Sequence, residues 1–179
     1  MEIAIRNYIA GSLELESNPR VWDTIVILDS HCRESQFVRT HARSSLILGF
    51  DDITTSTQGK RSPTAEDVDS AIQFASESDH LLVCCRAGQS RSAAIAFTIA
   101  FQQLGADTAC GLLNPKRHSP NSLIIDLAAN VIDDPLFVSV FRDWQTANSR
   151  IKLIDYVDEI EHEIDMLESN GARNRIVQA

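Results

Sequence analysis

Three short apolar runs are spaced through the first half of the chain, and helical patterns lie between them. The runs at 24–28, 45–50 and 80–84 are five or six residues long and rich in β-branched or large apolar side chains, as expected of buried strands. The segments 33–42 and 64–77 repeat apolar residues at helical spacing. Because strands alternate with helices, we expect an α/β fold whose central, mostly parallel sheet is flanked by helices on both faces.

After the third run the chain becomes helical. The segment 92–104 is apolar nearly all round and stops at Gly105, which is typical of a buried helix with a glycine C-cap. Further helices are expected at 107–113, 122–132, 135–149 and 151–168, the last with an apolar stripe opposite a row of acids. We therefore divide the chain into a domain at 1–149 and an acidic C-terminal helix and tail at 150–179.

Composition excludes several classes of protein. A length of 179 residues with 44% hydrophobic and 23% charged residues suits one globular domain with a full core. No apolar run approaches the roughly 18 residues of a membrane span, and the first residues lack the layout of a secretion signal. We expect no membrane span and a cytoplasmic location. The net charge of −9 disfavours nucleic acid as a bulk partner.

The charge is unevenly distributed along the chain. Residues 151–170 hold seven acidic residues and one lysine, a net charge of −6. The rest of the chain is only mildly acidic, so a local cationic site for an anion remains compatible with the composition.

The four cysteines are expected to be free thiols. Cys32, Cys84, Cys85 and Cys110 occur in a chain without a secretion signal, and none of them forms a Cys-x-x-Cys pair. The one histidine beside a cysteine is His31, and we interpret the pair as part of a turn at a strand end. The spacing therefore predicts no zinc site, and we expect no metal and no cofactor.

The segment 85–92, with the sequence CRAGQSRS, carries the candidate chemistry. It joins the third predicted strand to the most apolar helix. In such a loop, successive backbone N–H groups and the positive end of the helix dipole attract an anion, and Gly88 permits a tight backbone. A cysteine at the start of the loop feels the same donors, which favour the thiolate, so Cys85 is the candidate nucleophile.

The remaining residues of the loop are suited to phosphate. Arg91 has a planar fork that can bind two phosphoryl oxygens at once, and the fork stabilises the charge that develops on them during attack. Ser92 can donate its hydroxyl to the sulfur and help the thiolate leave. We expect the phosphate to be held by Arg86, Ala87, Gly88, Gln89, Ser90 and Arg91.

These residues resemble a family signature. Cys85, five intervening residues, Arg91 and Ser92 are similar to the signature of the cysteine-dependent protein phosphatases, and the form CRAGQSRS looks most like the dual-specificity branch. Ser119, Pro120 and Asn121 resemble a second motif of that branch. The resemblance runs from about residue 24 to residue 127. It implies a dual-specificity phosphatase-like fold over 1–149 and hydrolysis of phosphomonoesters through a phosphocysteine intermediate, without a metal.

By this resemblance Cys85 is the nucleophile, Arg91 the phosphate clamp and Asn121 a residue that supports the loop. The family's general acid is an aspartate about 30 residues before the cysteine, where this chain offers Asp51 and Asp52. We favour Asp52, because acids at that offset recur in the branch. Protonation of the leaving oxygen by such an acid typically contributes 10²- to 10⁴-fold in rate.

One position departs from the family pattern. The histidine that precedes the cysteine in the family is Cys84 in this chain. That histidine helps to hold the loop and to tune the thiol, so its loss implies a slower enzyme.

Three functions remain open at this point. The first is a protein tyrosine or dual-specificity type of phosphatase. The second is a catalytically weak or inactive module that binds a phosphorylated partner without turnover. The third is sulfur-transferase or arsenate-reductase chemistry, which needs a resolving thiol such as Cys32 or Cys84. Arg86 beside the nucleophile would suit an acidic substrate, such as a phosphorylated protein, a phosphoinositide or a nucleic-acid 5′ end. The sequence leaves the substrate and the oligomeric state undecided.

Overall fold

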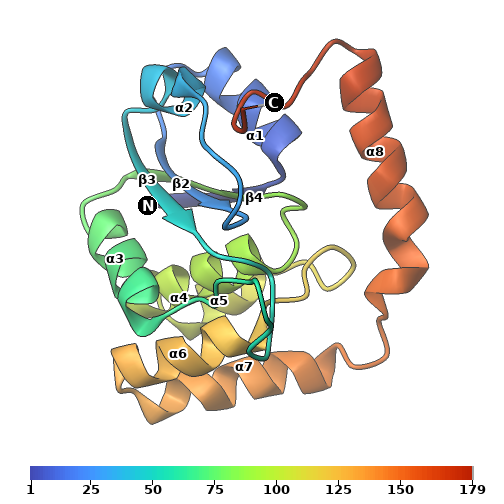
Figure 1. Ribbon diagram of the computed structural model, residues 1–179. Coiled ribbons are helices and arrows are strands. Elements are labelled where there is room, and N and C mark those ends of the chain that lie inside the picture. Colours follow the sequence, from blue (N-terminus) through green and yellow to red (C-terminus); the bar gives the residue numbers. More distant parts are fainter. Residues whose placement is uncertain (179) are drawn as a thin grey trace.

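Four parallel strands form the centre of the molecule (Figure 1). The computed structural model describes residues 1–178. The strands are β1 (Glu2–Arg6), β2 (Asp23–Leu28), β3 (Ser44–Gly49) and β4 (His80–Cys85), in the order β1-β4-β2-β3. The two central strands, β4 and β2, are buried along most of their length, as expected of a parallel sheet covered on both faces.

The sheet register brings the ends of the strands together at one edge. Ile27 of β2 pairs with Cys85, the last residue of β4. The turn after β2 and the loop after β4 therefore leave the sheet side by side. The carboxyl ends of the strands in open α/β sheets are the usual place for a ligand site.

Helices cover both faces of the sheet (Figure 1). The helix α4 packs against β1, β2 and β4 on one face, and α1 contacts β1 and β4 on the other. The bounds are α1 (Tyr8–Ser17), α2 (Gln36–His41), α3 (Ala65–Ala75), α4 (Arg91–Leu104), α5 (Ala106–Leu112), α6 (Ser122–Ile132) and α7 (Pro135–Ala147). Two separate apolar clusters result, a large one around α4 and a smaller one that contains Tyr8, Leu15, Trp22 and Cys84.

The α/β architecture expected from the sequence is confirmed, and each expected strand is present with its ends displaced by a residue at most. Two elements were not predicted, β1 and α1. The first strand has the sequence EIAIR, whose alternation of polar and apolar residues is a strand signal, but it is only five residues long. It pairs with β4 and so becomes an edge of the sheet.

The last helix begins later than the sequence predicts. Instead of one helix over 151–168, a 3₁₀ turn (Leu153–Tyr156) precedes α8 (Val157–Ser169). The amide of Ile151 donates to the carbonyl of Asn148, so the chain turns there before it can become helical. Ile154, which the sequence assigns to the apolar stripe of this helix, is exposed.

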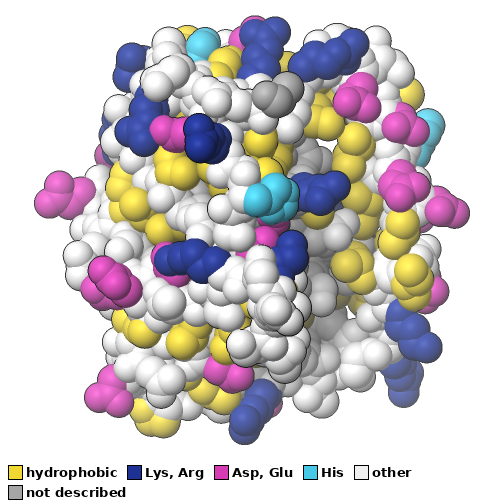
Figure 2. All heavy atoms as spheres, viewed as in Figure 1, with side chains coloured by type: hydrophobic (Ala, Val, Ile, Leu, Met, Phe, Trp, Pro, Cys, Tyr) yellow, Lys and Arg dark blue, Asp and Glu magenta, His cyan; other side chains and the backbone are white. Residues whose placement is uncertain are grey.

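The helix α8 runs along one side of the molecule, and the C-terminal segment then returns to the body (Figure 1). A groove of about 480 Å³ lies between α8, β1 and the loop after β4. Figure 2 shows this hollow, with apolar side chains of α8 facing it. Within residues 1–178, no helix is both long and apolar enough to cross a membrane.

Candidate active site

The loop between β4 and α4 has the geometry expected of an anion site. Cys85 is the last residue of β4 and is buried, and its Sγ lies 3.0 Å from the Oγ of Ser92 in the first turn of α4. Ser90, which directly precedes α4, makes no side-chain hydrogen bond to the first turn of the helix. The first N–H groups of a 14-residue helix are thus left without a side-chain cap, close to the sulfur.

Gly88 explains how the loop fits against the sheet. Its φ angle is +67°, a conformation that favours glycine. A Cβ at this position would lie 2.6 Å from the amide nitrogen of Asn7 and 2.7 Å from the carbonyl carbon of Arg6. The loop therefore packs directly on the backbone at the end of β1, and a larger residue would push the two apart.

The guanidinium of Arg91 is buried and only partly paired. Its Nη1 donates to the carbonyl oxygen of Phe50 at 2.8 Å and forms an ion pair with Oδ1 of Asp29, also at 2.8 Å. Its Nε is buried and has no hydrogen-bond partner among the residues that the structure describes. Because a buried donor normally has an acceptor, this N–H is available to an anion bound in the loop.

Asp52 lies at the edge of the same loop. Its Oδ1 accepts hydrogen bonds from Ser90 Oγ and from Asn121 Nδ2, each at 2.8 Å. Its Oδ2 lies 4.0 Å from Nε of Arg91, and about 40% of its side chain is exposed. The carboxyl group is therefore close to the anion site and accessible to a leaving group or to water.

Asn121 connects three segments around the site. Its Nδ2 also donates to the carbonyl of Ile53, and its Oδ1 accepts from the amide of Ile124 and so caps α6. Its own amide donates to the carbonyl of Ser90. Asn121 thus holds the Asp52 segment and α6 through its side chain and the loop after β4 through its backbone N–H.

Asp51, the other candidate acid, has different surroundings. It is buried, and its carboxylate accepts hydrogen bonds from the hydroxyl of Ser30 and the amide of Arg61, with Lys60 3.5 Å away. Burial alone would raise the pKa of Asp51, but these donors and the lysine charge outweigh it and lower the pKa to about 2. Asp51 is thus held as a carboxylate in a structural contact.

The other expected loop residues line its outer side. Arg86 and Ala87 are exposed, and Gln89 is half-buried. The carbonyl of Gln89 accepts a hydrogen bond from the amide of Ser119, which ties the loop to the segment before α6.

Cys84 faces away from this site. Because successive strand residues point to opposite faces, Cys85 lies in the large apolar cluster and Cys84 in the smaller one. Cys84 is fully buried, and burial raises its pKa far above the ordinary value. These surroundings disfavour Cys84 as a resolving thiol for Cys85.

Asp29 is a site residue that sequence reasoning missed. Its position directly after the strand 24–28 was the available signal, since polar residues at the carboxyl ends of parallel strands gather at one edge of the sheet. The prediction considered only the acids at the family's spacing. The ion pair with Arg91 joins residues that are far apart in the sequence, and the motif alone does not contain this contact.

Comparisons with known proteins give likenesses in structure only. No family model matches the chain, and no curated protein matches it in sequence. The similar solved structures include Tk-PTP in its active form, at 14% identity and a TM-score of 0.49, covering 73% of this chain and 90% of the other. PTPMT1 is similar at 16% identity and a TM-score of 0.49, covering 79% and 95%. Human DUSP28 is similar at 14% identity and a TM-score of 0.40, covering 83% and 94%.

In its signature loop, the chain resembles the cysteine-dependent phosphatases of the dual-specificity branch. At 12–16% identity a shared activity does not follow from likeness in structure. The function of this chain must therefore rest on the chemistry of its own side chains.

Proposed function

We propose that the chain is a cysteine-dependent phosphatase that hydrolyses phosphomonoesters through a covalent phosphocysteine on Cys85. The observation that carries the proposal is the free Nε of Arg91, buried in the loop that begins with Cys85 and continues into Ser92. A buried guanidinium N–H beside an uncapped helix N-terminus is suited to a dianionic phosphoryl group.

In the first step, the Cys85 thiolate attacks phosphorus and the bond from phosphorus to the ester oxygen breaks. The leaving oxygen takes a proton from Asp52, which is exposed at the edge of the pocket. The Arg91 fork and the loop amides stabilise the charge on the three equatorial oxygens, and they are oriented before the reaction begins.

In the second step, water attacks the phosphoryl group and gives its proton to the Asp52 carboxylate. The bond between sulfur and phosphorus breaks, and inorganic phosphate leaves. Ser92, 3.0 Å from the sulfur, donates a hydrogen bond to the departing thiolate. The chain's own residues, the substrate and water supply every atom and proton that the two steps need, without a metal.

The exposed Arg86 next to the nucleophile favours an acidic substrate such as a phosphorylated protein. The two classes of phosphoprotein, phosphotyrosine and phosphoserine or phosphothreonine, would be separated by turnover of matched phosphopeptides.

The proposal is tested by hydrolysis of para-nitrophenyl phosphate at saturating concentration, with and without a chelator. We expect turnover that the chelator leaves unchanged, and loss of more than 99% of the rate in Cys85→Ser, because an unactivated hydroxyl is a weak nucleophile. The matched control is Cys110→Ser, which changes a thiol on α5. No turnover by the native chain, with phosphate binding intact, would favour the inactive phosphate-binding module instead.

A further inference from the structure

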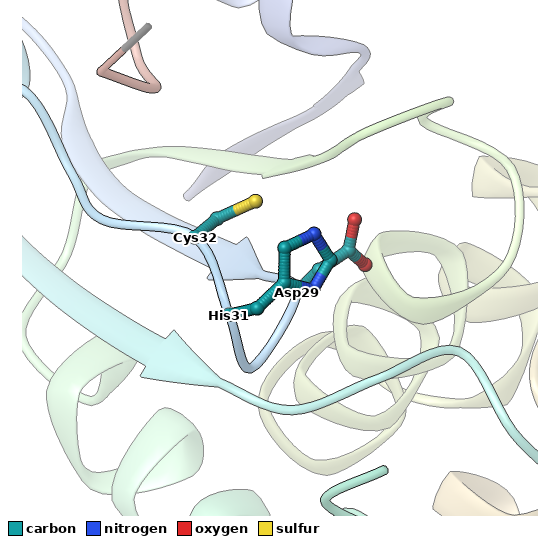
Figure 3. Close-up of side chains that lie close together, drawn as sticks. All are labelled: Asp29, His31 and Cys32. Atoms are coloured by element: carbon teal, nitrogen blue, oxygen red, sulfur yellow. The ribbon is translucent and has the colours of Figure 1, made fainter. Parts of the chain in front are cut away.

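We propose that Asp29, His31 and Cys32 form a zinc-binding site at the edge of the phosphate pocket. Each residue offers one ligand atom, and these atoms lie within 4.8 Å of one another. Among residues 1–178, no other group of three potential ligands is as close. Figure 3 shows the imidazole of His31 between the carboxylate of Asp29 and the sulfur of Cys32.

The three ligands come from one turn at the end of β2. The amide of Cys32 donates to the carbonyl of Asp29 at 2.8 Å, which closes the turn. The hydroxyl of Ser30, within the turn, donates to the buried carboxylate of Asp51. The backbone that carries the ligands is thus fixed on two sides, which lowers the entropy lost when a metal orders them.

The segment after the turn is also held. The amide of Ser35 donates to the carbonyl of Ile176, and the amide of Gln178 donates to the carbonyl of Arg33. The returning C-terminal segment therefore fixes the backbone that directly follows the turn.

The donor set favours zinc over harder cations. A carboxylate oxygen, an imidazole nitrogen and a thiolate are typical zinc ligands, whereas Mg²⁺ and Ca²⁺ prefer oxygen alone. Bond lengths of about 2.0–2.3 Å put the ligand atoms of a tetrahedral site roughly 3.3–3.6 Å apart, so side-chain rotations that close the observed spacing by about 1 Å suffice. His31 is exposed and the other two are half-buried, which leaves solvent access and a fourth coordination position.

The cysteine spacing in the sequence predicts no zinc site, and the proposed site differs from that expectation in taking only one of its ligands from a cysteine. His31 and Cys32 appeared in the sequence as a turn pair, and they are in a turn. The third proposed ligand, Asp29, lies close to His31 and Cys32 because of the turn, and the sequence alone does not show this closeness.

The site is coupled to the phosphate pocket through Asp29. The Oδ1 of Asp29 pairs with Nη1 of Arg91. A carboxylate has two oxygens, so Asp29 can keep this ion pair and bind a metal through Oδ2. A cation bound to this carboxylate fixes its position and neutralises the negative charge that otherwise faces an incoming phosphate dianion. Zinc should therefore tighten phosphate binding, and by thermodynamic reciprocity phosphate should tighten zinc binding.

The site is tested with Co²⁺, which replaces zinc in such sites and gives an absorption band when a thiolate is bound to it. We expect the metal-free chain to bind one equivalent with this band and to release it to Zn²⁺. The band should vanish in Cys32→Ser, and the affinity should fall at least about tenfold in His31→Ala, whose exposed side chain can be removed without unfolding the chain.

Two thiol controls keep the test specific. Cys85→Ser removes the proposed nucleophile and Cys110→Ser removes a distant thiol, and both should retain the cobalt band. Persistence of the band in Cys32→Ser, its loss in Cys85→Ser, or a zinc Kd weaker than about 1 mM in the native chain would overturn the site. None of these results depends on turnover, so they are independent of the proposed phosphatase activity.

The coupling is tested by calorimetric titration of inorganic phosphate into Cys85→Ser, with and without one equivalent of zinc. We expect zinc to lower the phosphate Kd about fivefold or more, and the effect to disappear when His31→Ala is added. An unchanged or weaker phosphate affinity in the presence of bound zinc would overturn the coupling.

Discussion

Asp51 and Asp52 are neighbours in sequence with different surroundings. Asp51 is buried and holds the turn after β2 through Ser30. Asp52 is partly exposed, beside the Nε of Arg91, and is positioned by Ser90 and Asn121. Burial and hydrogen bonding thus favour Asp52 over Asp51 as the proposed general acid.

Replacement of Asp52 by Asn should slow hydrolysis by an amount that depends on the leaving group of the substrate. We expect hydrolysis of unactivated alkyl or phenyl phosphates to slow by about 10²-fold or more, because their leaving oxygens need a proton. Hydrolysis of para-nitrophenyl phosphate should slow much less. The measurement is kcat for a series of leaving groups, and an equal loss across the series would contradict a general-acid role.

Asp51 should affect stability at acidic pH. Its pKa is lowered on folding from 3.8 to about 2, so its carboxylate contributes stability that is fully present above about pH 4. That contribution should disappear as the pH falls from about 4 to 2. Thermal unfolding of the native chain followed across this range should show a decrease in Tm that is smaller in Asp51→Asn.

At neutral pH the same variant provides a second comparison. Asp51→Asn weakens buried hydrogen bonds and should lower the free energy of unfolding by about 1–3 kcal/mol. Asp52→Asn, at an exposed position, should change it much less. If Asp51→Asn instead produced the leaving-group dependence expected of Asp52→Asn, the assignment of the two carboxylates would be reversed.

The loop after β4 depends on close packing against β1. Gly88 combines a φ of +67° with a backbone contact that leaves no room for a Cβ. Gly59 has a similar φ of +76°, but nothing lies within 4 Å of the position of its Cβ. The two glycines therefore separate the cost of the backbone conformation from the cost of the contact.

Replacement of each glycine by alanine should show this difference. Gly59→Ala should lower the free energy of unfolding by about 1–2 kcal/mol and leave phosphate binding unchanged. Gly88→Ala should cost more and weaken phosphate binding at least about tenfold, because the loop must move away from Asn7. Equal effects of the two changes on phosphate affinity would contradict the proposed packing.

Close packing also surrounds Cys84, which occupies the position of the histidine in the family pattern. A Cβ at Gly11 of α1 would approach the Sγ of Cys84 to 2.5 Å, so the helix lies directly on this thiol. A side chain larger than cysteine at position 84 would therefore be expected to press on α1. The cysteine is therefore explained by the close packing of α1, and it leaves the loop to be held by Gly88 and Asn121.

Elements with strong local signals were predictable, and those fixed by tertiary contacts were less so. The helix α6 occupies 122–132 as predicted, with Asn121 as its N-cap. The strand β1 is short and completes the sheet only by pairing with β4. The start of α8 was misplaced because its apolar spacing extends back through residues that form a turn and a 3₁₀ segment.

The C-terminal segment joins distant parts of the whole molecule. Ile176 is fully buried in the small apolar cluster with Cys84 and Leu15. The amide of Arg175 donates to the hydroxyl of Ser12 in α1. Before it, α8 is tied to the loop that precedes α6, since Arg117 pairs with Glu163. The acidic C-terminal segment is thus attached to the rest of the molecule both through α8 and through its last residues.

Removal of the buried anchor tests this attachment. Ile176→Ala should lower the free energy of unfolding by about 2–5 kcal/mol, because it leaves a cavity in a closed cluster. The matched control is Ile154→Ala, which changes a side chain that is 72% exposed and should act within about 0.5 kcal/mol. Similar denaturant midpoints for the two variants would mean that the tail does not stabilise the fold.

The part of the candidate site that is contiguous in the sequence was predictable from the sequence. The motif placed Cys85, Arg91 and Ser92 near one another because the loop is contiguous in sequence, and the structure brings Cys85 and Ser92 within 3.0 Å. Asp29 and the role of Asp51 could not be derived in this way, since both depend on which strands are neighbours in the sheet. Strand order is a tertiary property that periodicity does not encode.

The central claim is that the phosphoryl group is carried on Cys85, and trapping that intermediate tests it most directly. In Ser92→Ala the thiolate loses its hydrogen-bond donor at 3.0 Å, so the second step should slow more than the first. Turnover of para-nitrophenyl phosphate by this variant, quenched in acid within milliseconds, should yield a phosphorylated peptide containing Cys85, identified by mass spectrometry. The account predicts one phosphoryl group on that sulfur, absent in Cys85→Ser. Turnover without a labelled Cys85, or with the label on another residue, would contradict it.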